Sequence, residues 1–327
     1  MRESAGDSRS REHGGSPSSQ GGPPDAGPST ISFCGLELAH RVINGSGTFD
    51  AIAARKAFGA ALETEFPFAA YVSKTITLQP RAGNPPPRLW EAASGLINSI
   101  GLPNKGLDGY IAEDLPQLAS VTEAAGRAHA GRPVPLITNV MGSTAEELST
   151  LVRACDGRSE IAAVELNVSC PNVKTGLDIG ADPRQLEAVV LEARAQTRKP
   201  LIVKLTPNTA DVAACAQAAQ AGGADAVSLI NTLRAMALAK RIGGRPPAPW
   251  LGGGTGGLSG PAVRAVALAQ VAAVAARVSI PVVGMGGVQR AAHARDLIDV
   301  GATLVAIGTE TFRDPAAGAR IALELQG

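Results

Sequence analysis

The octet Glu165-Leu-Asn-Val-Ser-Cys-Pro-Asn172 holds the residues best suited to chemistry in this chain. The apolar run from Ile161 to Val168 is typical of a buried strand that ends at a loop. Cys170 follows it directly, so a thiol stands at the carboxyl end of that strand. In parallel barrels and open α/β sheets, ligands and catalytic groups lie at this end. A lone cysteine is most often a small buried hydrophobe, but this placement favours a role in a site.

The elements that must position this thiol alternate regularly along the chain. Candidate strands are 41–44, 71–74, 135–140, 163–167, 201–205, 226–230, 280–285 and 304–307. Candidate helices are 51–58, 107–118, 145–154, 183–196, 211–221, 261–278, 291–300 and 315–325, with Asp211 and Ser259 as N-cap residues. Eight alternations predict a parallel (β/α)8 barrel, which fits the length of 327 residues as one domain over 31–327.

The residues that follow these strands are unusually polar. They are Asn44-Gly-Ser-Gly47, Ser73-Lys-Thr75, Asn139, Asn167, Lys204, Asn231-Thr232, Gly284-Met-Gly-Gly287 and Gly308-Thr309. A glycine pair alone indicates only a tight turn. Two such loops after the seventh and eighth strands instead favour a phosphate cup of backbone N–H groups. Each asparagine is open to interpretation as a turn or cap residue, but four at the same rim favour a ligand with both donors and acceptors.

The octet resembles the active-site loop of class 1 dihydroorotate dehydrogenases, in which Asn-x-Ser-Cys-Pro-Asn carries the base. The membrane-associated class 2 enzymes have serine at the cysteine position. The continuation from Val173 to Pro183 resembles the type 1B catalytic subunit of the NAD-linked enzyme, and the similarity extends over about Phe33 to Pro315. The resemblance implies FMN at the carboxyl rim and oxidation of (S)-dihydroorotate to orotate in UMP biosynthesis. Cys170 would take the proton from C5, and FMN the hydride from C6.

The resemblance also assigns contacts residue by residue. It implies FMN contacts from Ser46, Lys74, Thr75, Asn139, Asn167, Lys204, Ile230, Gly260, Gly286, Gly287, Gly308 and Thr309. It implies substrate contacts from Lys74, Asn98, Ser99, Ile100, Gly101, Leu102, Asn167, Asn231 and Thr232. A lysine at a strand end is open to interpretation as a structural ion pair or a snorkelling surface chain, as well as a ligand contact. By resemblance, Lys204 is the cation that stabilises the reduced flavin ring.

No second cofactor site is evident in the sequence. Cys34, Cys155, Cys170 and Cys215 are widely spaced, which argues against an iron–sulfur cluster, a metal site or a disulfide framework. The glycine-rich run 252–257 precedes Leu-Ser-Gly-Pro rather than following a strand, so it is not a dinucleotide fingerprint. The resemblance implies a separate subunit with FAD and a [2Fe–2S] cluster that passes electrons to NAD+. The implied assembly is a heterotetramer built on a catalytic homodimer.

The composition excludes several other classes of partner. A net charge of +1 offers no electrostatic case for nucleic acid or a membrane surface. Residues 1–30 are rich in Gly, Ser and Pro without an apolar core, so we expect a disordered extension rather than a secretory signal or a membrane tether. The unpaired cysteines favour a reducing cytoplasm. The four histidines are expected to be surface or packing residues.

One departure and three alternatives accompany this interpretation. The segment from Arg234 to Trp250 is longer and richer in Pro and Arg than the family pattern, which leaves lid behaviour and partner geometry open. A type 1A enzyme would use fumarate without a partner, but Val173-Lys-Thr-Gly176 argues against it. A dihydrouridine synthase would need a basic RNA-binding face, which the near-zero charge does not offer. A non-flavin barrel that binds a phosphorylated metabolite would be colourless.

Overall fold

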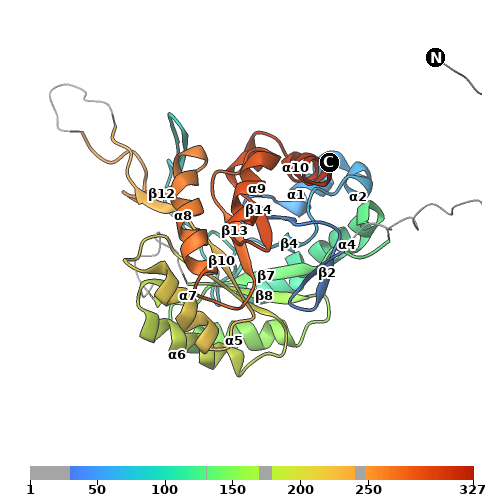
Figure 1. Ribbon diagram of the computed structural model, residues 1–327, viewed down its shortest axis with the longest axis horizontal. Helices are drawn as coiled ribbons and strands as arrows, with labels where there is room; N and C mark the ends of the chain where they lie inside the picture. Colours follow the sequence, from blue (N-terminus) through green and yellow to red (C-terminus); the bar gives the residue numbers. More distant parts are fainter. Residues whose placement is uncertain (1–29, 130, 169–178, 240–246) are drawn as a thin grey trace, which may run out of the picture.

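Eight parallel strands form the main sheet of the molecule (Figure 1). The computed structural model describes residues 30–129, 131–168, 179–239 and 247–327. In hydrogen-bonded order the strands are β3 (Val42–Asn44), β14 (Leu304–Ile307), β13 (Val282–Met285), β10 (Ala226–Leu229), β9 (Leu201–Lys204), β8 (Ala163–Asn167), β7 (Leu136–Val140) and β4 (Tyr71–Val72). All eight are buried, as apolar runs in a parallel sheet must be. The (β/α)8 barrel expected from the sequence is confirmed.

Asn44 closes the barrel between the two outer strands of this order. Its Oδ1 accepts a hydrogen bond from Val72 N at 2.8 Å, and its Nδ2 donates to Val72 O at 2.8 Å. Nearer the start of both strands, Ala69 N donates to Val42 O at 2.9 Å. One fully buried side chain therefore replaces the backbone ladder between β3 and β4, and the sheet presents no free edge there.

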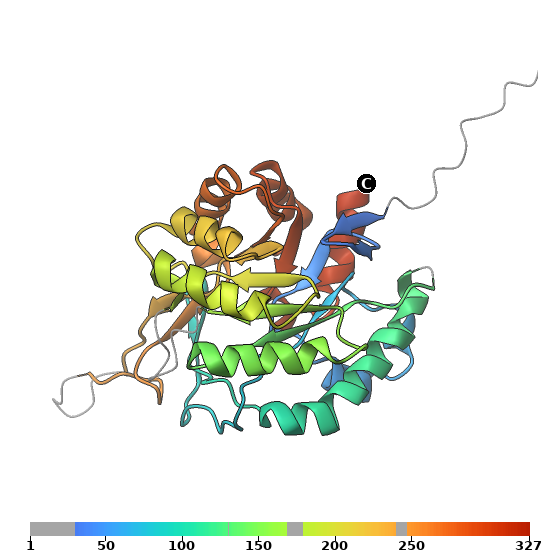
Figure 2. The same ribbon diagram turned by 90° about the horizontal axis from the view of Figure 1, so that it is seen from below.

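Helices pack around the outside of the sheet (Figure 2). They are α1 (Ala51–Phe58), α2 (Ala61–Thr64), α3 (Gly106–Gly109), α4 (Leu115–Ala124), α5 (Ala145–Asp156), α6 (Pro183–Arg194), α7 (Val212–Ala221), α8 (Arg264–Ala275), α9 (Ala291–Asp299) and α10 (Ala317–Gln326). Shorter turns are the π-helical η1 (Tyr110–Asp114) and the 3₁₀ turns η2 (Ala125–His129), η3 (Ile179–Ala181), η4 (Pro261–Val263) and η5 (Thr309–Phe312). None of the described helices is long and apolar enough to cross a bilayer.

Local sequence explains where several helices begin. Asp50, Thr144, Asp182 and Asp211 each accept a hydrogen bond from a backbone N–H in the first turn of the helix that follows. These side chains satisfy donors that the helix itself leaves unpaired. The N-cap expected at Asp211 is confirmed. The one expected at Ser259 is wrong, because Ser259 ends a strand and its Oγ donates to Leu96 O at 3.3 Å.

The interior of the barrel is apolar at one end and polar at the other. Its apolar end contains Ile43, Val72, Ile137, Ala163, Ile202, Ala226, Val283, Leu304 and Ala306. The hairpin of β1 (Ile31–Phe33) and β2 (Leu36–Leu38) covers this end with Phe33 and Leu38, each 1% exposed. Toward the carboxyl ends of the strands, the buried residues become polar and include Asn139, Glu165, Lys204 and Ser228. This change of polarity marks the functional end of the barrel.

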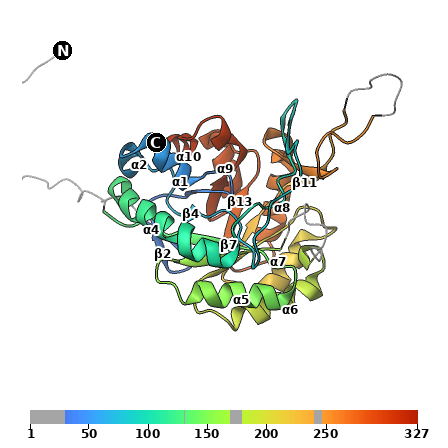
Figure 3. The same cartoon turned by 180° about the vertical axis from the view of Figure 1, so that it is seen from behind.

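A second, antiparallel sheet stands beside the barrel rim (Figure 3). Its order is β11 (Leu233–Ala235), β12 (Gly256–Ser259), β6 (Gly95–Asn98) and β5 (Leu89–Ala92). A small apolar cluster of Ile97, Ala237 and Leu251 packs against it. The rings of Trp90 and Trp250 also meet edge to face, with their centroids 5.4 Å apart. The Arg/Pro-rich segment therefore begins in β11 and ends with Trp250 packed against β5, with residues 240–246 outside the described part.

Element bounds differ from the expected ones mainly at two places. The expected helix 107–118 is divided into α3, η1 and α4 and extends to Ala124, because a π-helical turn interrupts the α-helical hydrogen bonds. The expected helix 261–278 begins with the short turn η4 and ends at Ala275. The expectation for the N-terminal extension falls on residues outside the described part.

Candidate active site

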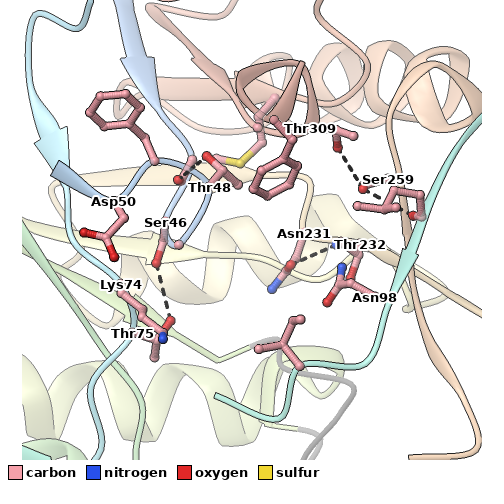
Figure 4. A pocket seen from close by; sticks show the side chains of 18 of the residues that line it. Ser46, Thr48, Asp50, Lys74, Thr75, Asn98, Asn231, Thr232, Ser259 and Thr309 are labelled. Atoms are coloured by element: carbon pink, nitrogen blue, oxygen red, sulfur yellow. Dashed lines mark hydrogen bonds between the residues drawn. The ribbon is translucent and has the colours of Figure 1, made fainter. Parts of the chain in front are cut away.

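A cavity of about 890 Å³ opens at the carboxyl ends of the barrel strands (Figure 4). Its wall combines strand ends from the barrel with β6 and β12 of the second sheet. Most residues expected from the sequence line it: Ser46, Lys74, Thr75, Asn98, Ile100, Gly101, Leu102, Asn167, Lys204, Ile230, Asn231, Thr232, Gly260, Gly286, Gly287, Gly308 and Thr309. Segments that are far apart in the sequence therefore meet around one space, which is large enough for a small-molecule cofactor and substrate.

Glycine-rich loops after β13 and β14 form one part of the wall. Gly286 and Gly287 have φ values of +140° and +68°, a region that disfavours any side chain. A Cβ atom on Gly286 would lie 2.5 Å from Ala267 Cβ, so the backbone approaches α8 as closely as possible. Beside this loop, Thr309 Oγ1 donates to Ser259 Oγ at 2.8 Å. Backbone amides and hydroxyls thus gather here without bulky side chains, as an anion site requires.

The loops after β3 and β4 continue the wall beside the loop of β14, and Figure 4 shows Ser46, Lys74 and Thr75 close together there. Ser46 Oγ donates to Ser73 O at 2.8 Å and lies 3.4 Å from Thr75 Oγ1. Asn167 Nδ2 donates to Thr75 Oγ1 at 3.3 Å. Lys74 is the exposed member of this group and lines the cavity. Its ammonium is therefore available to an acceptor on a bound molecule.

Lys204 is the buried cation of the site. It is 6% exposed and lines the cavity from the end of β9. Its ammonium makes no hydrogen bond or ion pair with the described part of the chain. Buried lysines are rarely left without a partner. The cavity therefore presents a buried donor that is available to an acceptor on a bound molecule.

Amide side chains face the cavity from β6 and from the loop after β10. Asn98, Asn231 and Thr232 lie together in Figure 4. Asn98 Nδ2 donates to Gly257 O at 3.2 Å, and Asn231 Oδ1 accepts from Thr232 N at 2.9 Å. Asn231 Nδ2 also approaches Asn167 Oδ1 at 3.5 Å. These contacts fix the orientation of the carboxamides, each of which offers a donor and an acceptor to a ligand.

Two expected contact residues do not line the cavity. Ser99 is fully buried, where its Oγ donates to Thr255 O at 2.8 Å and its N donates to Arg88 O at 2.8 Å. Asn139 is also fully buried, and its Nδ2 donates to Glu165 Oε2 at 2.5 Å. Both residues support the cavity wall from behind, and a direct ligand contact from either stays a prediction.

Cys170 falls outside the described residues, as does the rest of its loop to Asp178. Asn167, three residues earlier, is 6% exposed and lines the cavity at the end of β8. Among the described cysteines, burial raises the pKa of Cys34 and of Cys155 to about 12 and also raises that of Cys215. Because thiolates are the reactive form, these three cysteines are poor bases at neutral pH.

Sequence reasoning missed Glu165 and Ser228 as parts of the site. Glu165 is 4% exposed on β8 and accepts hydrogen bonds from Asn139 and from Ser228 Oγ, the latter at 2.7 Å. Strand alternation could have identified it, since Ala163, Glu165 and Asn167 must share the inward face. Several cavity-lining residues were missed as well, including Thr48, Asp50, Ser259, Gln289 and Arg313.

Comparison with known proteins places the chain in a well-populated group. Residues 29–327 match the family model described as dihydroorotate dehydrogenase. The chain is 41% identical to the dihydroorotate dehydrogenase B (NAD(+)) catalytic subunit of Citrifermentans bemidjiense, over 91% of this chain and 92% of that one. It is 42% identical to the protein of the same name from Pelobacter propionicus, over 90% of each chain. The crystal structure of the Eimeria tenella dihydroorotate dehydrogenase in complex with ferulenol shares the fold, with a TM-score of 0.73 at 22% identity over 92% of this chain and 84% of that one.

Proposed function

Because the chain belongs to the dihydroorotate dehydrogenase family, we propose that it is the catalytic subunit of an NAD-linked enzyme that oxidises (S)-dihydroorotate to orotate in pyrimidine biosynthesis. Relatives with more than 40% identity over nine tenths of the chain carry that name. The observation that carries the proposal is the cavity itself, which joins glycine-rich loops to a group of asparagines and two lysines. That arrangement suits an anionic phosphate, a flavin ring and a small polar acid in one space.

FMN fits the residues that line this cavity. The loops of Gly286, Gly287, Gly308 and Thr309 would hold the phosphate, and Ser46, Thr75 and Asn167 would contact the ring system. Lys204 supports this assignment because its buried ammonium lacks a partner in the described part of the chain. When bound, FMN supplies the acceptor for the hydride that leaves C6 of the substrate.

The protein's own residues orient the substrate and remove its proton. Asn98, Asn167, Asn231 and Thr232 would bind the alternating donors and acceptors of the pyrimidinedione edge. Lys74 would pair with the carboxylate or a ring oxygen of the substrate. Cys170 would take the proton from C5 as a general base, in a loop that follows the cavity-lining end of β8. Because the substrate would be held next to both acceptors, the proton and the hydride would be removed within one bound complex rather than in a bimolecular encounter.

Electrons must leave the reduced flavin through another protein. We propose a partner subunit with FAD and a [2Fe–2S] cluster that passes them to NAD+, in a heterotetramer built on a catalytic homodimer. The name "catalytic subunit" of the relatives supports this assembly. We also propose a cytoplasmic location, which agrees with free thiols at the three described cysteines.

An anaerobic visible spectrum of the purified chain, before and after addition of dihydroorotate, tests the proposal. A yellow protein whose flavin band bleaches on addition is the expected result. Reoxidation by NAD+ only in the presence of the partner subunit would then support the NAD-linked type, whereas direct reoxidation by fumarate would contradict it. A colourless protein that takes up no added FMN would reject a flavin mechanism.

A further inference from the structure

A buried carboxylate lies beneath the floor of the cavity. Glu165, 4% exposed, points into the barrel from β8 and accepts hydrogen bonds from Asn139 Nδ2 at 2.5 Å and Ser228 Oγ at 2.7 Å. Both donors are neutral, and Glu165 forms no ion pair with the described part of the chain. Burial of a carboxylate without a cation is costly, so a role beyond packing is indicated.

The strand register places this carboxylate beside Lys204. Glu165 on β8 is level with Ile202 on β9, and Ser228 on β10 is level with Lys204. The hydrogen bond from Ser228 to Glu165 therefore crosses the inward face of β9 between Ile202 and Lys204. Below this bridge the interior is apolar, with Ile202 and Ala163. The carboxylate and hydroxyl thus form the surface from which the lysine side chain extends into the cavity.

The charges of Glu165 and Lys204 act on any molecule that binds in the cavity. Lys204 lines the cavity, whereas Glu165 does not. Two opposite charges on adjacent strands, one reaching the ligand and one held below it, produce a field that is weaker than that of the lysine alone. Since the surroundings are buried, solvent screens this field little. The electrostatic energy of an anion in the cavity would therefore depend on both the lysine and the glutamate charge.

We propose that Glu165 is a positioning residue, held by Asn139 and Ser228 beneath Lys204, whose negative charge limits how strongly the site favours reduced over oxidised FMN. This inference rests on the proposed function, because it takes FMN as the occupant of the cavity. The physical reason is that reduced FMN carries an added negative charge on its ring, near the lysine. Removal of the carboxylate would strengthen the lysine's effect on that charge.

The test is the midpoint potential of the FMN-loaded chain, measured by anaerobic titration with dithionite and reference dyes rather than with dihydroorotate. Glu165→Gln keeps the shape and removes the charge. We expect it to raise the preference for reduced FMN about tenfold, which for a two-electron couple is a rise of about 30 mV. Ser228→Ala is the matched control, because it removes a hydrogen bond to the same carboxylate but keeps the charge. It should change the preference by less than about threefold.

A second pair of variants tests the same balance of charges with the lysine charge removed. Lys204→Gln should lower the preference for reduced FMN, and adding Glu165→Gln to it should restore about tenfold of that loss. Equal potentials for Lys204→Gln and the double variant, or equal shifts for Glu165→Gln and Ser228→Ala, would overturn the inference. These outcomes are separate from failure of the proposed function, in which FMN binds but dihydroorotate does not bleach it. A chain that binds no FMN would reject both.

Discussion

Asparagine performs three different tasks at the rim of this barrel. Asn44 is fully buried and substitutes for a strand ladder. Asn139 is equally buried but supports Glu165 from behind the cavity. Asn98 and Asn231 line the cavity itself. The same carboxamide chemistry serves each role, and only its burial and its partners distinguish a structural asparagine from one available to a ligand.

At the residue scale, Cys170→Ser is the most direct test of the base. A serine hydroxyl is a far weaker base than a thiol, so bleaching of bound flavin by dihydroorotate should slow by about 10² to 10⁴-fold while FMN stays bound. The wild-type rate should rise with pH toward about 8.5, the ordinary thiol pKa. Anaerobic stopped-flow absorbance measures both.

Cys34→Ser is the control for that experiment. Cys34 lies in the hairpin at the opposite end of the barrel, where its Sγ donates to Asp225 O at 3.3 Å, a bond that a serine can also make. In Cys34→Ser, dihydroorotate should bleach the bound flavin at the wild-type rate. Near-normal bleaching by Cys170→Ser at neutral pH would remove Cys170 from the mechanism.

At the scale of the elements, closure of the barrel between β3 and β4 rests on the backbone bond from Ala69 N to Val42 O and on the side chain of Asn44. Asn44→Ala would leave Val72 N and Val72 O without the partners they have at 2.8 Å. Each unpaired buried backbone group costs about 1–3 kcal/mol, so we expect a loss of about 2–5 kcal/mol in the free energy of unfolding. Urea denaturation followed by circular dichroism measures it.

Asn84→Ala provides the comparison for Asn44→Ala. Asn84 lies outside the barrel and donates to Ser99 O and Ser99 Oγ at 3.2 and 3.0 Å. Its removal should cost only about 1 kcal/mol, the usual net value of a hydrogen bond. Equal losses for the two variants would show that Asn44 contributes no more than an ordinary polar contact.

The glycine loop after β13 makes a second prediction at this scale. Gly286→Ala would bring a Cβ within 2.5 Å of Ala267 Cβ at a φ of +140°, so the loop must move away from α8. We expect the Kd for FMN to rise at least tenfold, measured by quenching of flavin fluorescence. Gly35 also has a positive φ, of +79°, but no atom lies within 4 Å of the Cβ that Gly35→Ala would add. It should bind FMN normally, and weakened binding there would indicate a general folding defect instead.

The elements also show what the sequence can predict and what it cannot. Apolar runs such as Ala163–Asn167 and Leu304–Ile307 were predicted to the residue, because buried parallel strands have a strong local signature. The sheet of β5, β6, β11 and β12 was missed. β12 reads Gly-Gly-Leu-Ser and pairs with β6, about 160 residues away in sequence, so neither its composition nor its neighbours indicate a strand.

The candidate site likewise contains residues that local sequence predicts and residues whose position depends on tertiary contacts. Strand-end residues were predicted to meet because parallel strands bring their carboxyl ends together. The burial of Ser99 depends on how one turn packs against Thr255, and no local pattern encodes that contact. Glu165 was within reach of strand alternation, but a charged residue in an apolar run was not assigned a role.

At the scale of the whole molecule, the end of the barrel opposite the cavity contains a histidine pair. His40 precedes β3 and His129 ends η2, with ring centroids 5.5 Å apart. His40 Nδ1 accepts a hydrogen bond from Val42 N at 3.2 Å, which requires that this nitrogen be unprotonated. Burial, and secondarily the charge of His129, lowers the pKa of His40 to about 4, and burial also lowers that of His129. Both residues were expected only to pack or to lie at the surface, and they also couple stability to pH.

This pair predicts acid sensitivity between about pH 6.5 and pH 4. In that window the unfolded chain binds a proton at His40, whose ordinary pKa is 6.5, while the native chain does not. Stability therefore falls as the pH drops, by up to about 3 kcal/mol from this residue, since one pKa unit corresponds to about 1.4 kcal/mol. Urea unfolding at pH 7.5 and pH 5 measures the loss.

Buried carboxylates also respond to acid, so the quantity to compare is the difference in acid loss between wild type and His40→Gln. The variant should lose less stability on acidification, because glutamine can accept the bond from Val42 N without titrating. His293→Gln, at a half-buried histidine near the cavity end, is the comparison: burial also lowers the pKa of His293, so its loss should reduce the acid effect, but by less than loss of His40. An acid loss in His40→Gln as large as in wild type would assign the sensitivity to other groups and leave the pair a packing contact.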